Sequence, residues 1–297
     1  MIVDCHVHLL QARNFDRDTL ARLGLPVPID TRIEDLISWL TEAHVDKALV
    51  MGQDATRVQN TSFGEDYVIQ ATEEYSDKLI GLASLEPLDP LGSTNREALK
   101  YFVNAVVDHG LRGLLLTPPF GHYYSNDRQV YPFYEKAVEL DVPIQFHHSA
   151  APGPPIIAPL KYAKISLLND VCIDFPELRI IVEHLAYPWT EELLAMMTST
   201  KNMYADISMT YQRPTSLTWS LVMAKEYGVI DRIMYGSDYC SRRTLDFSDY
   251  PADDFRRYIE WIRNGLNQVA AKCGWPTFTE EEIKGILGEN AARLYRL

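Results

Sequence analysis

The segment Met1-Ile2-Val3-Asp4-Cys5-His6-Val7-His8 starts with a short apolar run and ends in two histidines. Seven more apolar, β-branched runs follow it, and the eight together are Ile2–Cys5, Lys47–Met51, Leu79–Ala83, Gly113–Leu116, Pro143–Phe146, Arg179–Val182, Asn202–Ile207 and Arg232–Tyr235. Their starts lie about 20–45 residues apart, the length of a strand plus a crossover helix. Because successive positions are apolar, we expect both faces of each strand to be buried, as in a parallel sheet.

Helical patterns fill the intervals between these runs. The interval Asn95–His109 has apolar residues at i, i+3, i+4 and i+7 and stops before a glycine. Similar patterns predict helices over Glu34–His44, Tyr131–Leu140, Ile165–Asp174, Glu191–Met197, Ser216–Tyr227 and Asp253–Cys273. Thr279 with Glu282 three residues later predicts a capping box at the start of a last helix.

Eight strands that alternate with helices predict an α/β fold, a (β/α)8 TIM barrel that forms one domain over residues 1–297. A doubly wound sheet is the alternative, but evenly repeated units favour the barrel. Gln11–Asp30 and the proline-rich Ser149–Pro159 are expected to be long loops on the side where the barrel strands end.

The composition restricts the class of protein. Lys and Arg number 28 and Asp and Glu 41, so the formal net charge is −13, and so acidic a surface repels nucleic acid. No apolar run reaches about 18 residues, so we expect no membrane span. The N-terminal residues lack a secretory pattern, and the cysteines form no C-x-x-C pair. These features predict a cytoplasmic protein with reduced thiols.

Several of the apolar runs end in residues that bind metals. In a strand, residues i and i+2 point to the same face, so His6 and His8 aim together. Other runs stop at His147-His148, at Glu183-His184 and at Ser237-Asp238. The active site of a barrel lies at the C-terminal ends of its strands, so these side chains can converge there. Histidines scattered in the core are the alternative, but their clustering at strand ends favours a site for Zn²⁺ or Mn²⁺.

The same segments resemble the amidohydrolase superfamily, and within it the amidohydrolase-related branch of aminocarboxymuconate-semialdehyde decarboxylase. The similar motifs are Asp4-Cys5-His6-Val7-His8, Phe146-His147, Ile181-Val182-Glu183-His184, Tyr235-Gly236-Ser237-Asp238-Tyr239, Phe175-Pro176-Glu177-Leu178-Arg179 and the tail Ile286 to Tyr295. The resemblance implies that the metal ligands are His6, His8, His147 and Asp238. It also implies catalytic roles for His184, as a base, and for Asp238, and suggests a homodimer.

The chain departs from the family pattern at three places. His148 follows His147 and should point away from it, where it can pack behind the site. Leu185-Ala186-Tyr187-Pro188 replaces a glycine-rich turn and brings Tyr187 close to the expected pocket. The fourth run ends in Thr117, where binuclear relatives carry a Lys or Glu that bridges two metals. The sequence therefore predicts a mononuclear centre.

Two reactions suit such a centre. We expect a non-oxidative decarboxylase that acts on a small carboxylated aromatic or muconate-like substrate. The alternative is a metal-dependent hydrolase of a lactone or another cyclic ester or amide, and a barrel that only binds a ligand is a third possibility. Carboxylates need cations, so Arg242 and Arg243 are candidate substrate ligands together with Tyr187 and His122, and Arg57 and Arg213 are weaker ones. A pocket without arginine favours a neutral lactone.

Overall fold

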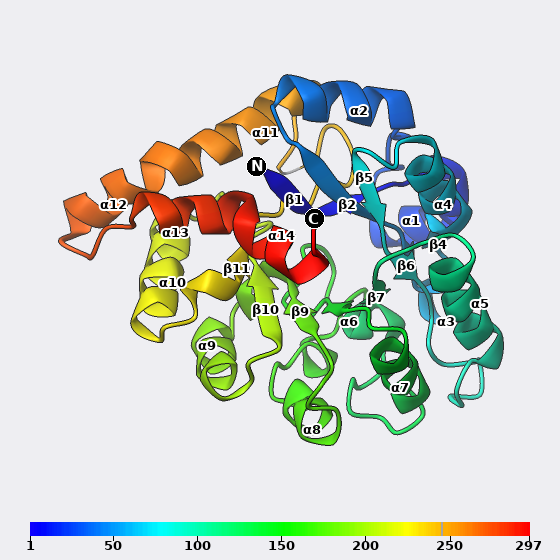
Figure 1. The fold of residues 1–297 in the computed structure, drawn as a ribbon. Coiled ribbons are helices and arrows are strands. Elements are labelled where there is room, and N and C mark those ends of the chain that lie inside the picture. The colour runs from blue at the N-terminus through cyan, green and yellow to red at the C-terminus, as the bar shows by residue number, and fades with distance from the viewer. Residues whose placement is uncertain (245) are drawn as a thin grey trace.

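The computed structural model describes residues 1–244 and 246–297 and forms a barrel of parallel strands surrounded by helices (Figure 1). In the described residues eight strand positions make the ring, and they are β1 (Val3–His8), β2 (Lys47–Met51), β5 (Leu79–Gly81) with its continuation β6 (Ala83–Ser84), β7 (Leu114–Leu116), β8 (Ile144–Phe146), β9 (Ile180–Val182), β10 (Met203–Asp206) and β11 (Ile233–Met234). The predicted (β/α)8 barrel is therefore confirmed.

Main-chain hydrogen bonds close the ring at two places. Between β5 and β6, the Leu82 N–H donates to the Val50 carbonyl at 2.9 Å, so the strand continues from one neighbour to the next. Between β1 and β11, the Cys5 N–H donates to the Tyr235 carbonyl at 3.0 Å. In the same seam the Asp238 N–H donates to the His6 carbonyl at 2.9 Å. The first and last strands of the barrel thus lie side by side.

Helices cover the outside of the ring. They are α2 (Ile33–Glu42), α4 (Glu65–Glu74), α5 (Arg96–Val107), α7 (Tyr131–Glu139), α8 (Leu167–Asp174), α9 (Thr190–Ser199), α10 (Pro214–Glu226) and α11 (Pro251–Glu260), which continues through the π-turn η5 (Trp261–Gly265) into α12 (Leu266–Cys273). The sequence predicted each of these except α4. No helix in the described residues is long and apolar enough to cross a membrane.

The apolar core has two layers. Buried side chains such as Val3, Leu49, Leu115 and Ile181 fill the inside of the barrel, and a larger cluster lies between the strands and the helices. A short turn, η4 (Ile230–Arg232), precedes β11. The chain ends with α13 (Glu280–Lys284), η6 (Gly285–Glu289) and α14 (Asn290–Tyr295). These last helices pack beside the N-terminus of β1 (Figure 1), and the predicted capping box at Thr279 is present. With the interior filled, the site is expected at the mouth where the strands end.

The connections at this mouth carry short elements of their own. The interval 11–30, expected as a loop, contains η1 (Ala12–Asn14) and α1 (Arg17–Leu23). Between β2 and α4, the hairpin of β3 (Gln53–Asp54) and β4 (Ser62–Phe63) encloses α3 (Thr56–Gln59). Other short elements are α6 (Pro118–Gly121), η2 (Leu160–Tyr162) and η3 (Glu183–Ala186). Of these elements, α1, β3, α3, α6 and η3 contribute residues to the lining of the cavity described next.

Candidate metal centre and active-site cavity

The structure brings His6, His8 and Asp238 together at the mouth of the barrel. The two histidines alternate along β1, and their Nε2 atoms lie 3.1 Å apart. Asp238 Oδ1 lies 3.3 Å from His6 Nε2 and 3.6 Å from His8 Nε2. His6 is fully buried, His8 is buried, and Asp238 is partly exposed, so the three donors face one another with access from one side only.

Hydrogen bonds at the far side of each ring fix how the two imidazoles are protonated. Ser208 has one hydroxyl hydrogen, and it is donated to Asp206 Oδ1. His6 Nδ1 therefore carries a proton that it donates to Asp206 Oδ2 at 3.0 Å. His8 Nδ1 donates to the Gly52 carbonyl at 3.0 Å. With both Nδ1 atoms protonated, the Nε2 lone pairs point at the same small volume, an arrangement that calls for a cation.

Asp238 owes its position to the seam between β1 and β11. Its backbone has a φ of 57°, which turns the chain just after the strand. The preceding Ser237 N–H donates to Asp4 Oδ1 at 2.9 Å, so a buried carboxylate on β1 holds the start of this turn. Cys240 lies beside Asp238, with its Sγ 3.6 Å from Asp238 Oδ1.

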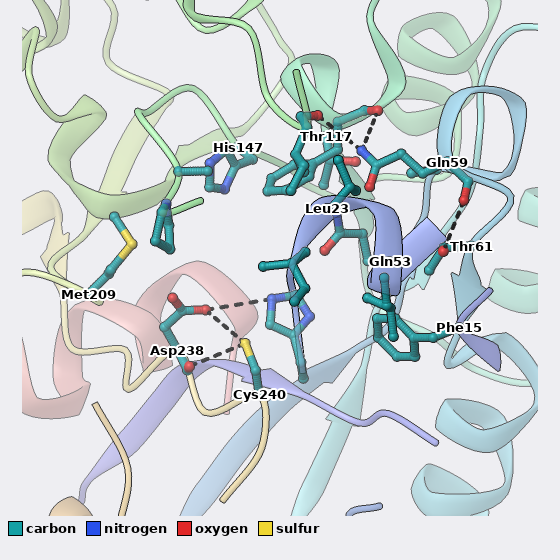
Figure 2. Close-up of a pocket in the computed structure, with 18 of the residues that line it drawn as sticks. Phe15, Leu23, Gln53, Gln59, Thr61, Thr117, His147, Met209, Asp238 and Cys240 are labelled. Atoms are coloured by element: carbon teal, nitrogen blue, oxygen red, sulfur yellow. Dashed lines mark hydrogen bonds and ion pairs between the residues drawn. The ribbon is translucent and has the colours of Figure 1, made fainter. Parts of the chain in front are cut away.

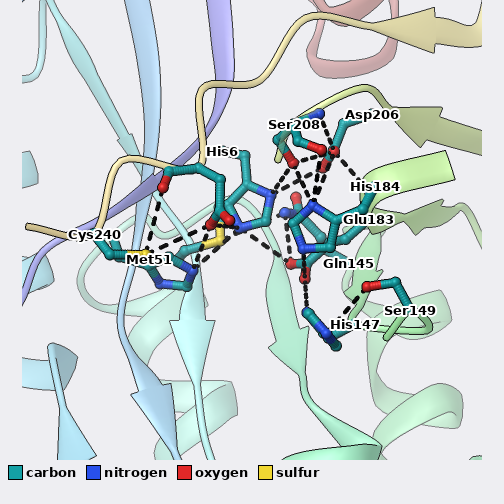
Figure 3. A network of polar contacts seen from close by, with 12 residues as sticks. His6, Met51, Gln145, His147, Ser149, Glu183, His184, Asp206, Ser208 and Cys240 are labelled. Atoms are coloured by element: carbon teal, nitrogen blue, oxygen red, sulfur yellow. Dashed lines mark hydrogen bonds and ion pairs between the residues drawn. The ribbon is translucent and has the colours of Figure 1, made fainter. Parts of the chain in front are cut away.

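Glu183 lies at the centre of the polar cluster (Figure 3), although the sequence analysis gave it no role. Its Oε2 accepts a hydrogen bond from His147 Nδ1 at 2.7 Å, and its Oε1 accepts one from Gln145 at 3.0 Å. Oε1 also lies 3.6 Å from His6 Nε2. His147, predicted as a metal ligand, contacts Glu183 and accepts a hydrogen bond from the Ser149 hydroxyl at 3.2 Å. Glu183 thus links His147 to the group formed by His6, His8 and Asp238.

His184 packs directly against this group. Its ring is stacked on that of His6, with the centroids 5.2 Å apart. Because the Ser208 hydrogen is already donated, His184 Nδ1 must donate to Ser208 Oγ at 2.7 Å. The Nε2 lone pair of His184 is then free to accept a proton. Residues 184 to 186 all have φ between 50° and 57°, an uncommon run of left-handed non-glycine residues at the end of β9.

The electrostatics of the cluster also fit a bound cation. Burial lowers the pKa of His6, but the charges of Glu183, Asp238 and Asp206 outweigh burial and raise this pKa to about 10. Burial raises the pKa of Asp238 to about 6. Burial and the neighbouring histidines lower the pKa of His8 and that of His184 to about 3. The carboxylates of Glu183, Asp206 and Asp238 thus stabilise positive charge at His6, and a divalent metal bound at His6 Nε2 would supply that charge in place of a proton.

A cavity of about 250 Å³ opens above these residues (Figure 2). Its floor includes His8, His147, Glu183, His184 and Asp238. Its walls are largely apolar, with side chains from α1, α6 and the proline-rich connection, and they include Phe15, Leu20, Leu23, Phe120, Ile157 and Met209. Within residues 1–244 and 246–297, the lining contains neither arginine nor lysine.

The residues predicted to bind substrate lie outside this lining. The Arg242 guanidinium packs over the Trp39 ring at 5.9 Å, and exposed Arg243 pairs with Asp249. Tyr187 lies under Arg213, whose guanidinium is 4.5 Å from the ring centroid. The His122 Nε2 donates to the Ile156 carbonyl at 3.0 Å, and this residue lines a neighbouring cavity.

Arg57 and His148 also lie away from the substrate cavity. Arg57 lies beside Glu86, with its Nε 3.5 Å from Glu86 Oε1, and donates to the Gly121 carbonyl. His148 is fully buried behind the site, and burial lowers its pKa to about 4. Its ring centroid lies 5.8 Å from that of Phe146, so the expectation that it packs behind His147 agrees with its place.

Comparison with known proteins places this arrangement in a family. The amidohydrolase family matches residues 3–297. The chain belongs to the amidohydrolase family. The resemblance noted in the sequence is thus confirmed, and members of this family are metal-dependent enzymes, in agreement with the cluster of metal-binding side chains.

Individual relatives of this amidohydrolase differ in activity. A 2-keto-4-carboxy-3-hexenedioate hydratase of Sphingobium sp. (strain NBRC 103272 / SYK-6) is 30% identical over 164 residues, 48% of this chain and 46% of the relative. The match therefore spans about half the length of that protein. Solved structures include an uncharacterized TIM-barrel protein from Bordetella bronchiseptica (TM-score 0.71, 20% identity, 99% of this chain and 97% of the other). A 2,6-dihydroxybenzoate decarboxylase from Rhizobium has a TM-score of 0.66 and 15% identity, with 99% and 98% covered.

Proposed function

We propose that this amidohydrolase is a mononuclear, metal-dependent decarboxylase that removes the single carboxylate of a small aromatic acid without an oxidant. The observation that carries the proposal is the cavity, which is apolar in its walls and has the metal-binding cluster on its floor. An aromatic ring fits such walls. One carboxylate can be neutralised at the floor, whereas the described lining offers no cation for a second one.

The charge of the protein agrees with a substrate that carries little charge. At a net charge of −13 the surface disfavours the approach of a polycarboxylate. Buried carboxylates near the floor, such as Glu183, would add to the repulsion if the site were empty. A monocarboxylic aromatic acid, or its phenolic derivative, meets the smallest barrier among the acids that the family resemblance suggested.

His6, His8 and Asp238 would hold the metal, with Glu183 and His147 beside them. This nitrogen-rich donor set suits Zn²⁺ better than Mn²⁺. When bound, the metal supplies positive charge that neutralises the substrate carboxylate and polarises a neighbouring oxygen.

The protein side chains can manage the proton that the reaction requires. In decarboxylation the carbon–carbon bond breaks, its electron pair stays on the ring carbon, CO₂ leaves, and that carbon takes up a proton. The Asp238 carboxyl lines the cavity, where an oxygen not bound to the metal can pass a proton from water to that carbon. His184, which lines the same cavity and which burial keeps neutral, can accept a hydrogen bond at Nε2 from a phenolic hydroxyl of the substrate.

The test measures two products from one preparation of zinc-loaded protein. Benzoates with one carboxylate and one or more hydroxyls are screened for CO₂ release, beside a panel of neutral lactones followed by acid formation. We expect CO₂ release, lost in Asp238→Ala and retained in the control His109→Ala, which replaces a histidine remote from the cluster that pairs with Glu73. Lactone turnover without CO₂ release would reject the decarboxylase.

Hydrolysis of a neutral lactone or another cyclic ester or amide is the second candidate. It is favoured by the absence of cations in the described lining, because a neutral substrate needs none. The His184 Nε2 lone pair would then accept a hydrogen bond from the attacking water, and Asp238 would pass the proton of that water to the leaving oxygen.

A further inference from the structure

Gln53 presents an unused amide to the cavity. The residue lies on β3, and its side chain lines the cavity without a hydrogen-bond partner among residues 1–244 and 246–297. Figure 2 shows it beside Leu23, in the space between Thr117 on one side and Asp238 and Cys240 on the other. This amide therefore faces whatever occupies the cavity.

The backbone around Gln53 is held firmly. The preceding Gly52 carbonyl accepts the hydrogen bond from His8 Nδ1, and the Gly52 N–H donates to the Ser84 hydroxyl at 3.1 Å. The following Asp54 accepts a hydrogen bond from the Glu86 N–H at 2.8 Å. The amide thus keeps a fixed place relative to the proposed metal ligands, which is what selective recognition requires.

Thr117 presents a second unused polar group. It directly follows β7, and its side chain lines the cavity with no hydrogen-bond partner in the described part of the chain. It is only 5% exposed, and its carbonyl is engaged by the N–H groups of Phe120 and Gly121, each at 3.0 Å. The neighbouring Thr61 and Gln59 are committed, since the Thr61 hydroxyl donates to the Gln59 carbonyl and the Gln59 amide donates to the carbonyls of Phe120 and Ile157.

A ligand that fills the cavity strips water from both groups. Each then loses a hydrogen bond unless the ligand replaces it, and the surrounding Leu23 and Phe120 side chains offer none. We propose that Gln53 and Thr117 form a neutral pair that selects substrates with an uncharged hydrogen-bonding substituent, a hydroxyl above all, on the ring. This inference rests on the proposed function for the placement of the carboxylate and names the substrate class as a ring-hydroxylated aromatic monocarboxylate.

Binding measurements test the pair independently of turnover. Dissociation constants for zinc-loaded protein are measured by calorimetry with salicylate and with its 2,3-, 2,4- and 2,5-dihydroxy analogues as probes. We expect at least one of the additional hydroxyls to tighten binding about three- to tenfold, the effect of one neutral hydrogen bond. Gln53→Leu or Thr117→Val should abolish this advantage while the Kd of salicylate changes less than about twofold.

The control Thr61→Val removes a lining hydroxyl that is already committed, so it should keep the advantage of the dihydroxy probe. Gln53→Ala provides a second truncation if leucine disturbs the hairpin, and melting temperatures confirm that each variant is folded. If no analogue binds more tightly than salicylate, or if the advantage survives in both variants, the proposal is overturned. Because binding is the readout, loss of the hydroxyl preference in a protein that releases no CO₂ upholds the pair and rejects only the decarboxylase.

Discussion

Replacing Asp206 by asparagine should weaken zinc binding although Asp206 is not a proposed ligand. Asp206 Oδ1 accepts hydrogen bonds from the His184 N–H, the Ser208 N–H and the Ser208 hydroxyl, whereas Oδ2 faces His6 Nδ1 at 3.0 Å. Three donors around Oδ1 force an asparagine to place its oxygen there and its NH₂ group toward His6. That NH₂ group would confront the Nδ1 proton, so the imidazole must shift its proton to Nε2. His6 then has no lone pair for a metal.

The size of this effect follows from the contact that is lost. A hydrogen bond to a charged group contributes about 1.5–3 kcal/mol, and each 1.4 kcal/mol is a tenfold change in Kd, so Asp206→Asn should raise the Kd for zinc roughly 10- to 100-fold. Competition with a chromophoric chelator at fixed pH measures this Kd. Asp254→Asn is the matched control, because Asp254 is equally buried but bonds to Ser248 on the way into α11. A zinc Kd for Asp206→Asn within about threefold of the native value would refute the assignment of the His6 proton.

Other predictions concern stability. Burial lowers the pKa of His148 from 6.5 to about 4, so the unfolded chain binds this proton first as pH falls, and the metal-free protein should lose about 3 kcal/mol across that window. His148→Leu should flatten the dependence of the unfolding free energy on pH, measured by urea denaturation at several pH values. An unchanged pH dependence contradicts this. Gly64 has a φ of +104°, and a Cβ there would lie 2.3 Å from the Gly52 Cα. Gly64→Ala should therefore cost more stability than Gly24→Ala, where the space is open, by about 1–3 kcal/mol; equal losses would argue against the close contact. Thr279→Ala should cost about 1 kcal/mol through the capping box and Thr279→Ser much less, measured as shifts in the denaturation midpoint.

The sequence predicts the barrel well where local composition and burial agree. Ile180–Val182 is apolar on both faces because one face fills the barrel and the other meets the helices. Helix α4 escapes prediction because its buried residues are only Val68 and Ala71. The expected helix Asp253–Cys273 is interrupted by the π-turn η5, where Trp261 packs against Gly265. Such a packing fit is decided by tertiary contacts that periodicity does not encode.

In the candidate site, too, some residues are predictable from the sequence and others are not. His6, His8 and Asp238 are predictable because strand ends meet at one mouth. Asp206 was hidden inside a run interpreted as a strand, yet an acid between Ala205 and Ile207 is itself a signal, because a buried carboxylate needs a partner.

Loop residues near the proposed ligands are less predictable. The sequence motif assigns a role to His184 and none to the preceding Glu183, although the Glu183 carboxylate lies 3.6 Å from His6 Nε2. Arg242 and Arg243 follow Asp238 closely in sequence but turn to Trp39 and to Asp249. Distance along a loop does not fix the direction in which a side chain points.

The seam between β1 and β11 has a consequence for how the enzyme is made. His6 and His8 are synthesised at the outset, whereas Asp238 follows the last strand of the ring, so a growing chain holds only half of the site until its barrel can close. Capture of the proposed metal would therefore be a late step of biogenesis, after the ring is complete. A cation held across the seam would fasten the earliest and latest strands together, and resistance to unfolding would rise with the supply of free metal in the cell.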